Sequence, residues 1–267
     1  MNPVDNPFSP GAGTPPAVLA GRADILAAAR DAIASLVLGQ APRPMLVTGH
    51  RGMGKTVLLN AFARQARGVE LTVVRIEAGR GRSFEELLAA GVRLRERDGR
   101  ASGLVLLIDE AQNLGTRGLE DLAAWIAARR ASGSSVWAAA AGLPFESRDT
   151  KAGNEKSFMR FAVDVLTQDE TRFAFEETLR REGSSIESAA LAYLTTRSGE
   201  YPYFVQELGA HTWNAAQDAV ITLEDARRGC DAAVRTLTEG LLRVRAARSD
   251  AEGLAAPYLK ALLGDRT

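Results

Sequence analysis

The fold of this chain is decided by one stretch, Gly49-His50-Arg51-Gly52-Met53-Gly54-Lys55-Thr56. The stretch fits the pattern G-x-x-x-x-G-K-[ST] at every fixed position. Glycines let a backbone curl around an anion with its N–H groups pointing inward, and the N-terminus of a following helix adds free N–H groups and a favourable dipole. Lys55 would supply a positive charge to the β- and γ-phosphates, and the Thr56 hydroxyl would bind Mg²⁺. The pattern therefore predicts a site for ATP and Mg²⁺.

The flanking sequence supports this interpretation over a coincidental glycine-rich turn. A short apolar strand is expected at Met45–Thr48, and an amphipathic helix at Lys55–Arg67. A strand, a phosphate-binding loop and a helix are the expected order of elements around such a site. The predicted nucleotide-binding residues of this segment are Gly49, His50, Arg51, Gly52, Met53, Gly54, Lys55, Thr56 and Val57.

An acidic pair follows the second decisive segment of the chain. Leu104–Ile108 is a run of five apolar residues, as expected of a strand buried on both faces, and Asp109 and Glu110 come directly after it. Ligands bind beyond the carboxyl ends of parallel strands, so this pair is expected to converge with the phosphate loop. We expect Asp109 to hold Mg²⁺ together with Thr56, and Glu110 to orient and polarise the attacking water. The alternative is two solvated acids at a strand end.

Strand and helix patterns alternate up to residue 167, with further strands expected at Leu71–Glu77, Ser135–Ala141 and Phe161–Leu166 and helices at Ser83–Arg97 and Leu119–Arg130. This order predicts an α/β P-loop fold in which a five-stranded parallel sheet lies between helices. Helical patterns then cover 169–181, 186–197, 202–217 and 223–245, which predicts a smaller all-helical lid domain. A capping box of Thr167 and Glu170 is expected at the start of the first of these helices. The predicted domains are a flexible N-terminal segment at 1–16, a nucleotide-binding core at 17–167, a helical lid at 168–248 and a helical tail at 249–267.

The composition excludes several classes of protein. Lys and Arg number 33 and Asp and Glu also 33, so the chain as a whole lacks the basic footprint of a nucleic-acid-binding protein. No apolar run approaches the roughly 20 residues that span a bilayer, and residues 1–16 contain no signal-peptide core. The single cysteine, Cys230, is expected to be a small buried apolar residue. These features predict a cytoplasmic protein without a membrane partner.

The two motifs, with Ala111-Gln112-Asn113-Leu114 after the acidic pair, resemble AAA+ ATPases, and most closely their archaeal-type, origin-initiator-like branch. Leu19-Ala20-Gly21-Arg22 resembles the segment that leads into the adenine pocket of that group, and the segment Gly199–Phe204 resembles the start of its lid helix. The resemblance implies that Leu19 and Pro202 contact adenine. It also implies an arginine finger, for which Arg160 is chosen over Arg148, and assembly into a homo-oligomer.

The chain departs from the family pattern at three places. The expected fourth strand ends in Ala138-Ala139-Ala140-Ala141-Gly142, where relatives place a polar sensor residue. Tyr201-Pro202-Tyr203 stands where many relatives have an arginine. The 22 residues after Arg245 are too few for a DNA-binding winged helix. These departures bear on hydrolysis and DNA binding more than on nucleotide binding.

The sequence predicts an ATP-hydrolysing AAA+-type ATPase that acts as a nucleotide-dependent switch on a macromolecular partner. A protein partner agrees with the charge balance better than nucleic acid does. One alternative is an ATP-binding scaffold with little turnover, which the absent sensors favour and Glu110 opposes. Another is a DNA-associated ATPase of replication, recombination or transposition. A metabolic kinase fits less well, because no compact substrate-binding insertion follows the phosphate loop.

Overall fold

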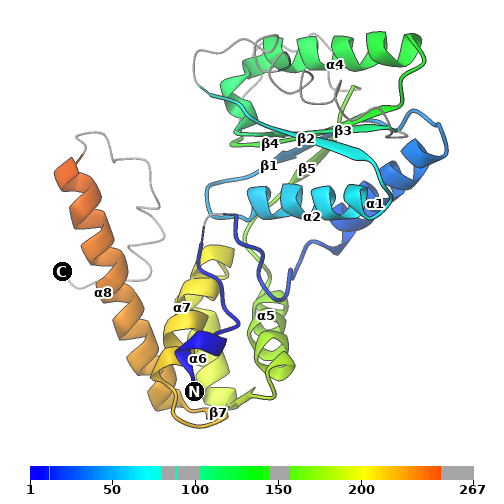
Figure 1. The fold of residues 1–267 in the computed structure, drawn as a ribbon. Coiled ribbons are helices and arrows are strands. Elements are labelled where there is room, and N and C mark those ends of the chain that lie inside the picture. The colour runs from blue at the N-terminus through cyan, green and yellow to red at the C-terminus, as the bar shows by residue number, and fades with distance from the viewer. Residues whose placement is uncertain (12, 80–87, 89–102, 145–156, 248–267) are drawn as a thin grey trace. The chain divides into compact units, whose positions relative to one another are not determined.

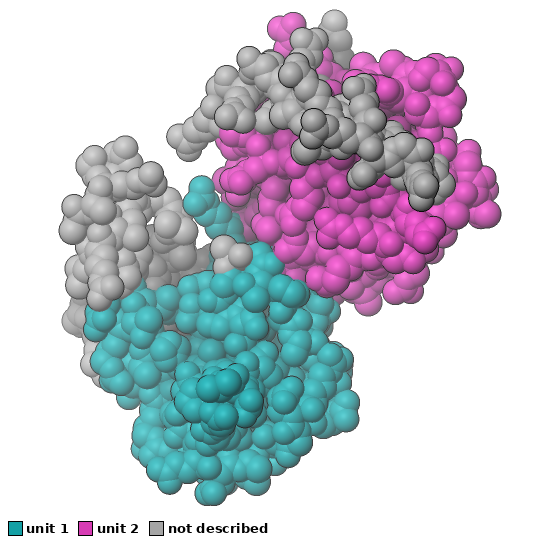
Figure 2. Space-filling model, viewed as in Figure 1, with its two compact units in different colours: residues 1–21, 51–54, 165–267 teal, residues 22–50, 55–164 magenta. Residues whose placement is uncertain are grey.

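The computed structural model describes residues 1–11, 13–79, 88, 103–144 and 157–247. The chain divides into two compact units (Figure 2). The unit made of residues 22–50 and 55–164 is called the sheet unit below, and the unit made of residues 1–21, 51–54 and 165–267 is called the helical unit. Within the described ranges, no helix is long and apolar enough to cross a membrane.

The sheet unit is built on one five-stranded sheet with the order β2-β3-β4-β1-β5. All four strand pairings are parallel, which confirms the predicted sheet. The strands are β1 (Met45–Thr48), β2 (Thr72–Glu77), β3 (Leu104–Asp109), β4 (Val136–Gly142) and β5 (Met159–Ala162).

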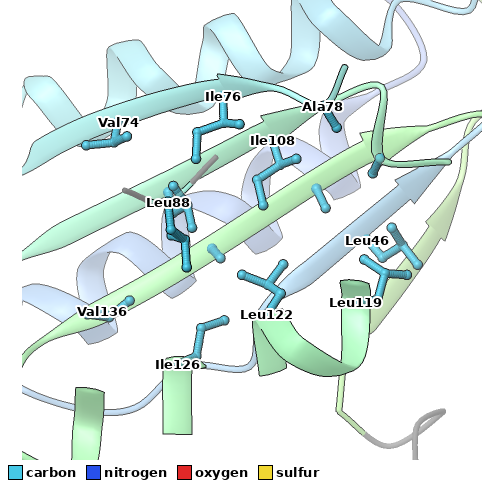
Figure 3. Packing of buried hydrophobic residues seen from close by; sticks show 14 of the residues in the cluster. Leu46, Val74, Ile76, Ala78, Leu88, Ile108, Leu119, Leu122, Ile126 and Val136 are labelled. Atoms are coloured by element: carbon cyan, nitrogen blue, oxygen red, sulfur yellow. The ribbon is translucent and has the colours of Figure 1, made fainter. Parts of the chain in front are cut away.

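Helices cover both faces of this sheet (Figure 1). The helices α1 (Ala23–Val37) and α2 (Lys55–Arg67) lie on one face, and α4 (Gly115–Ala131) lies on the other. Side chains of a strand alternate between faces, so every second residue of β3 joins the cluster beneath α4 (Figure 3). That cluster includes Leu104, Leu106 and Ile108 of β3 with Leu119, Leu122 and Ile126 of α4. Burial on both faces explains why β3 is a continuous apolar run.

The register of the three central strands places their carboxyl ends at one edge. Ile108 of β3 is paired with Ala140 of β4, and Ala140 is paired with Leu46 of β1. The next residues along β3 are the acidic pair, and β1 ends two residues further on, at Thr48. The elements that carry the predicted site therefore end side by side, with only β4 between them.

Two element boundaries in this unit differ from the expectation. The predicted fifth strand is present, but its bounds differ: it was expected at Phe161–Leu166 and lies at Met159–Ala162. Pairing with the four-residue β1 sets the position of β5, and three of the four β5 residues are exposed, so the apolar pattern did not mark the paired segment. Helix α4 begins at Gly115 rather than at Leu119. Of the helix expected at Ser83–Arg97, only Leu88 lies among the described residues, and it is buried in the same cluster as β3 and α4.

The helical unit contains α5 (Gln168–Arg181), α6 (Ser188–Ser198), α7 (Pro202–Ala215) and α8 (Leu223–Ala247). The predicted capping box at the start of α5 is present. The Glu170 N–H donates to the Thr167 hydroxyl at 3.2 Å, and the Thr167 N–H donates to the Glu170 carboxylate at 2.8 Å. A parallel pair of two-residue strands, β6 (Ser185–Ile186) and β7 (Val220–Ile221), was not expected, because two residues carry no periodic signal.

The N-terminal segment, for which the sequence predicts flexibility, makes packing and hydrogen-bond contacts within the helical unit. Residues Pro3–Asp5 form the 3-10 turn η1, and Phe8 is 4% exposed. The Phe8 ring lies against Gly209 of α7 and 6.1 Å from the ring of Phe175. Hydrogen bonds to α7 and to the residues after it involve Met1, Asn2, Asn6 and Ser9. The composition of residues 1–16 could not show this, because the contacts are made with residues about 200 positions away.

Replacing Phe8 with alanine should destabilise the helical unit. Loss of a buried phenyl ring costs about 3 kcal/mol or more of the free energy of unfolding. The matched control is Val4→Ala, since Val4 is 88% exposed, and it should change this free energy by about 0.5 kcal/mol or less. Urea unfolding followed by tryptophan fluorescence measures both variants. Equal midpoints for Phe8→Ala and Val4→Ala would contradict the packing of residues 1–9 on α7.

Candidate nucleotide-binding site

Glycine is required at three positions of the loop between β1 and α2, at two because of backbone conformation and at one because of close packing. Gly52 and Gly54 have φ angles of 76° and 84°, in the left-handed region that side chains disfavour. A Cβ on Gly54 would meet nothing within 4 Å, so its conformation alone requires glycine. A Cβ on Gly49 would lie 2.4 Å from the carbonyl oxygen of Val163, so close backbone approach requires glycine there. The loop thus has the curled backbone that the sequence pattern predicts.

Lys55, the first residue of α2, places its ammonium group back over the loop. Its Nζ donates hydrogen bonds of 2.8 Å to the carbonyl oxygens of Gly49 and His50. Thr56 follows in the first helical turn and is partly exposed, whereas Val57 is buried. The charge of Lys55 and the N-terminus of α2 therefore lie at the same loop, as an anion site requires.

The tip of the loop, Arg51–Gly54, belongs to the helical unit. The hydroxyl of Tyr201, the N-cap residue of α7, donates a hydrogen bond to the carbonyl oxygen of Arg51. A Cβ on Gly52 would lie 2.7 Å from this hydroxyl oxygen, so Gly52 also makes room for the tyrosine. Met53 is buried. In the sequence, Tyr201 stands within the resembling segment Gly199–Phe204 and at a departure from the family pattern, and no role was predicted for it.

The two residues expected at the adenine base also lie in the helical unit. Leu19 is partly exposed and precedes Gly21, whose φ of 65° and close approach to the Glu170 side chain fix the turn into α1. Pro202 is the first residue of α7 and is also partly exposed. Contact of Leu19 and Pro202 with adenine stays a prediction.

The acidic pair lies where β3 ends. Asp109 is the last residue of the strand, and Glu110 adopts a left-handed conformation with φ 55°. The Glu110 N–H donates to Asp109 Oδ1 at 2.9 Å, and the Asp109 carbonyl accepts from the Ala78 N–H at 2.9 Å. Both acidic residues are partly exposed. The strand end thus presents two oxygen-bearing side chains, and oxygen is the ligand that Mg²⁺ prefers.

The end of β4 has no polar side chain of its own, because it consists of four buried alanines and Gly142. Gln112 supplies polar atoms at this point. Its Oε1 accepts from the Leu143 N–H at 2.9 Å, and its Nε2 donates to Glu110 Oε2. The Gly142 carbonyl accepts from the Gly49 N–H at 3.1 Å. Sequence reasoning quoted Gln112 only as part of a resemblance and assigned it no function.

Arg160 lies on the edge strand β5, and its side chain is exposed. It is paired with Leu46 of β1, and it lies inside the strand rather than just before it. An exposed arginine on a sheet edge can reach a neighbouring chain, and its role as an arginine finger stays a prediction. Arg148 lies outside the described residues.

The single cysteine, Cys230, and the second histidine, His211, both lie in the helical unit. Cys230 is buried on α8 in the helical unit, and burial raises the pKa of its thiol to about 11, so the thiol is unreactive near neutral pH. His211 lies on α7, where its Nε2 is 3.8 Å from Glu207. Cys230 thus packs as the small buried apolar residue that the sequence predicts.

Comparison with known proteins gave one family and many related folds. The model of the ATPase family associated with various cellular activities (AAA) matches residues 45–146. A search of the curated proteins found no match.

Three solved structures illustrate the fold similarity. The Holliday junction branch migration motor RuvB of Thermotoga maritima is 16% identical with a TM-score of 0.61, over 80% of this chain and 70% of that one. The Orc1 protein of Aeropyrum pernix, solved in complex with DNA, is 15% identical with a TM-score of 0.56, over 83% and 69%. PCH-2 of C. elegans is 16% identical with a TM-score of 0.55, over 80% and 68%.

These structural similarities concern the fold, and the family match concerns the segment that holds the phosphate loop and the acidic pair. Both agree with the strand order and the loop geometry described above. Residues 45–146 match the AAA family model, and the chain has the fold of the AAA+ P-loop ATPases to which it is similar.

Proposed function

We propose that this chain binds ATP with Mg²⁺, hydrolyses it, and uses its nucleotide state to change its contacts with a macromolecular partner. The observation that carries the proposal is the shared edge of the sheet. At this edge, the loop after β1 leads to Lys55 and Thr56. Asp109 is the last residue of β3, and Glu110 follows it. Only β4 lies between β1 and β3 in the sheet. An anion-binding loop beside two carboxylates is the arrangement that phosphoryl transfer from ATP to water requires.

Each residue would have a distinct role in the reaction. The loop N–H groups and Lys55 would bind the phosphates, and Thr56 and Asp109 would hold Mg²⁺, which neutralises charge on the phosphate oxygens. Glu110 would accept a proton from the attacking water as the water oxygen bonds to the γ-phosphorus. The bond from that phosphorus to the β–γ bridging oxygen then breaks, and ADP leaves with this oxygen. Arg160 would stabilise charge in the site of a neighbouring copy.

The contact between Tyr201 and the loop tip supports the switch. Tyr201 caps α7 and its hydroxyl binds the Arg51 carbonyl, within one compact unit. A phosphate that reorients the loop backbone would change this hydrogen bond and so the start of α7. A ligand shifts a conformational equilibrium only if it interacts differently with the two states, and this contact provides such a difference.

The nature of the partner separates two versions of the proposal. A protein partner agrees with the zero net charge of the chain. A DNA-associated ATPase is the second version, since RuvB is described as a branch migration motor and the Orc1 structure contains DNA. DNA binding that appears with ATP and weakens steeply with salt would support the second version, because phosphate contacts release counterions.

A scaffold that binds ATP with little turnover is the competing function. The absence of a polar side chain on the end of β4, at Ala138–Gly142, favours it. The intact acidic pair opposes it.

Turnover by the wild type beside Lys55→Ala and Glu110→Gln tests the proposal. Lys55→Ala should lose more than tenfold in ATP affinity, because a charge-assisted contact with phosphate disappears. Glu110→Gln should bind ATP like the wild type but turn over roughly a hundredfold more slowly, the scale of general base catalysis. Phosphate release and nucleotide binding are measured in parallel. A wild type no faster than Glu110→Gln would favour the scaffold, and a wild type without nucleotide binding would refute the proposal.

Gly54→Ala tests the phosphate loop against a matched control, Gly39→Ala. Both glycines have positive φ, 84° and 73°, and a Cβ would meet nothing within 4 Å at either position. Each substitution should therefore cost about 1 kcal/mol in backbone strain. Only Gly54→Ala should also weaken ATP binding, by roughly tenfold or more, because it alone alters the loop that cradles phosphate. Isothermal titration and thermal unfolding measure the two effects, and equal ATP affinities for the two variants would contradict the placement of the site.

A further inference from the structure

Both the oxygen and the nitrogen of the Gln112 side-chain amide form hydrogen bonds. Gln112 lies in the 3-10 turn η2 (Ala111–Asn113) that follows β3. Its Oε1 accepts from the Leu143 N–H at 2.9 Å, and its Nε2 donates to Glu110 Oε2. A main-chain N–H can only donate and an ionised carboxylate can only accept, so the chemistry of the partners fixes which end of the amide faces which.

The position of Gln112 leaves no room for a side chain on Gly142, the last residue of β4. A Cβ on Gly142 would lie 2.7 Å from Gln112 Oε1, 2.8 Å from its backbone nitrogen and 3.1 Å from the Ala111 nitrogen. Gly142 therefore has to be glycine while Gln112 holds this position. A polar side chain on this residue of β4 and Gln112 in its observed place are mutually exclusive, so the polar group at this edge comes from η2 instead of from the strand.

One peptide unit joins this arrangement to the phosphate loop. The Gly142 carbonyl accepts from the Gly49 N–H at 3.1 Å, and the N–H of the same peptide, that of Leu143, donates to Gln112. A trans peptide is planar and directs its C=O and N–H in opposite directions. The first glycine of the loop is thus linked to Glu110 through one rigid peptide and one side chain, all within the sheet unit.

From this chain of hydrogen bonds we propose that Gln112 is a positioning residue for ATP hydrolysis, holding the Glu110 carboxylate in the orientation that activates water. The inference rests on the proposed function. Gln112 engages one oxygen of Glu110, Oε2, which leaves Oε1 to accept the proton of the attacking water. Gln112 itself touches no substrate and acts only through Glu110.

Two substitutions separate positioning from a purely structural role. Gln112→Ala removes both hydrogen bonds and should lower kcat roughly tenfold to a hundredfold, the scale of one lost hydrogen bond to a charged group, with the ATP affinity within about twofold of wild type. Gln112→Glu keeps the shape and the acceptor for Leu143 but sets a second carboxylate against Glu110. Its kcat should fall at least as far as that of Gln112→Ala. A residue that only held the turn would tolerate Gln112→Glu.

Asn113 provides a matched control in the same turn. Its Nδ2 donates to the Ala78 carbonyl at 2.7 Å, so it carries an amide hydrogen bond that does not involve Glu110. Asn113→Ala should leave kcat within about twofold of wild type. A kcat loss in Asn113→Ala as large as that in Gln112→Ala would show that disturbing the turn is sufficient, and would overturn the positioning role.

The double variant Gln112→Ala/Glu110→Gln tests whether Gln112 acts through Glu110. Single-turnover hydrolysis by the double variant should be no slower than that by Glu110→Gln alone, because residues that act as one unit are not additive. The inference would be overturned if the double variant were slower than Glu110→Gln by the whole factor that Gln112→Ala alone costs in the wild-type background. If the wild type hydrolyses ATP and the Gln112 variants hydrolyse it equally fast, the positioning role alone is overturned. If the wild type hydrolyses no ATP, the proposed function and this inference are overturned together.

Discussion

The parallel pairing of β3, β4 and β1 is the constraint on which the candidate site depends. Parallel strands end at the same edge of a sheet, so the phosphate loop after β1 and the acidic pair of β3 meet there although about 55 residues separate them in sequence. The register, with Ile108, Ala140 and Leu46 level with one another, brings the two segments within reach of the single peptide that follows β4. Changing this register by one residue would move every side chain of the shifted strand to the opposite face of the sheet.

Packing between strands and helices maintains this register. Apolar residues of β3 are buried beneath α4 on one face of the sheet, and α1 and α2 cover the other. The buried core carries none of the chemistry itself. It fixes the end of β3, where Asp109 and Glu110 lie, and the end of β1, from which the loop leads to Lys55. Functional groups held on rigid elements can keep the geometry that phosphoryl transfer requires.

The parts of the site that local sequence could predict are those fixed by local chemistry. The left-handed backbone at residue 54 requires glycine, and Lys55 and Thr56 must follow it. The loop can therefore be predicted from its sequence pattern. Leu104–Ile108 with its acidic end is visible because a buried strand is uniformly apolar. The roles of Gln112 and Tyr201 depend on partners brought together by the fold, namely the peptide after Gly142 and the carbonyl of Arg51. The seat of Phe8 on α7 and the start of β5 were missed for the same reason.

The most direct test of the central claim is a calorimetric titration of the wild type with a non-hydrolysable ATP analogue. The titration is made once with Mg²⁺ and once with the metal chelated. The claim is that the phosphate loop and the acidic strand end form one nucleotide site. The account predicts saturable binding of one nucleotide per chain that is tighter with Mg²⁺, since Thr56 and Asp109 would contact the metal rather than the nucleotide. Absence of binding at millimolar nucleotide, or binding that is indifferent to Mg²⁺, would contradict it.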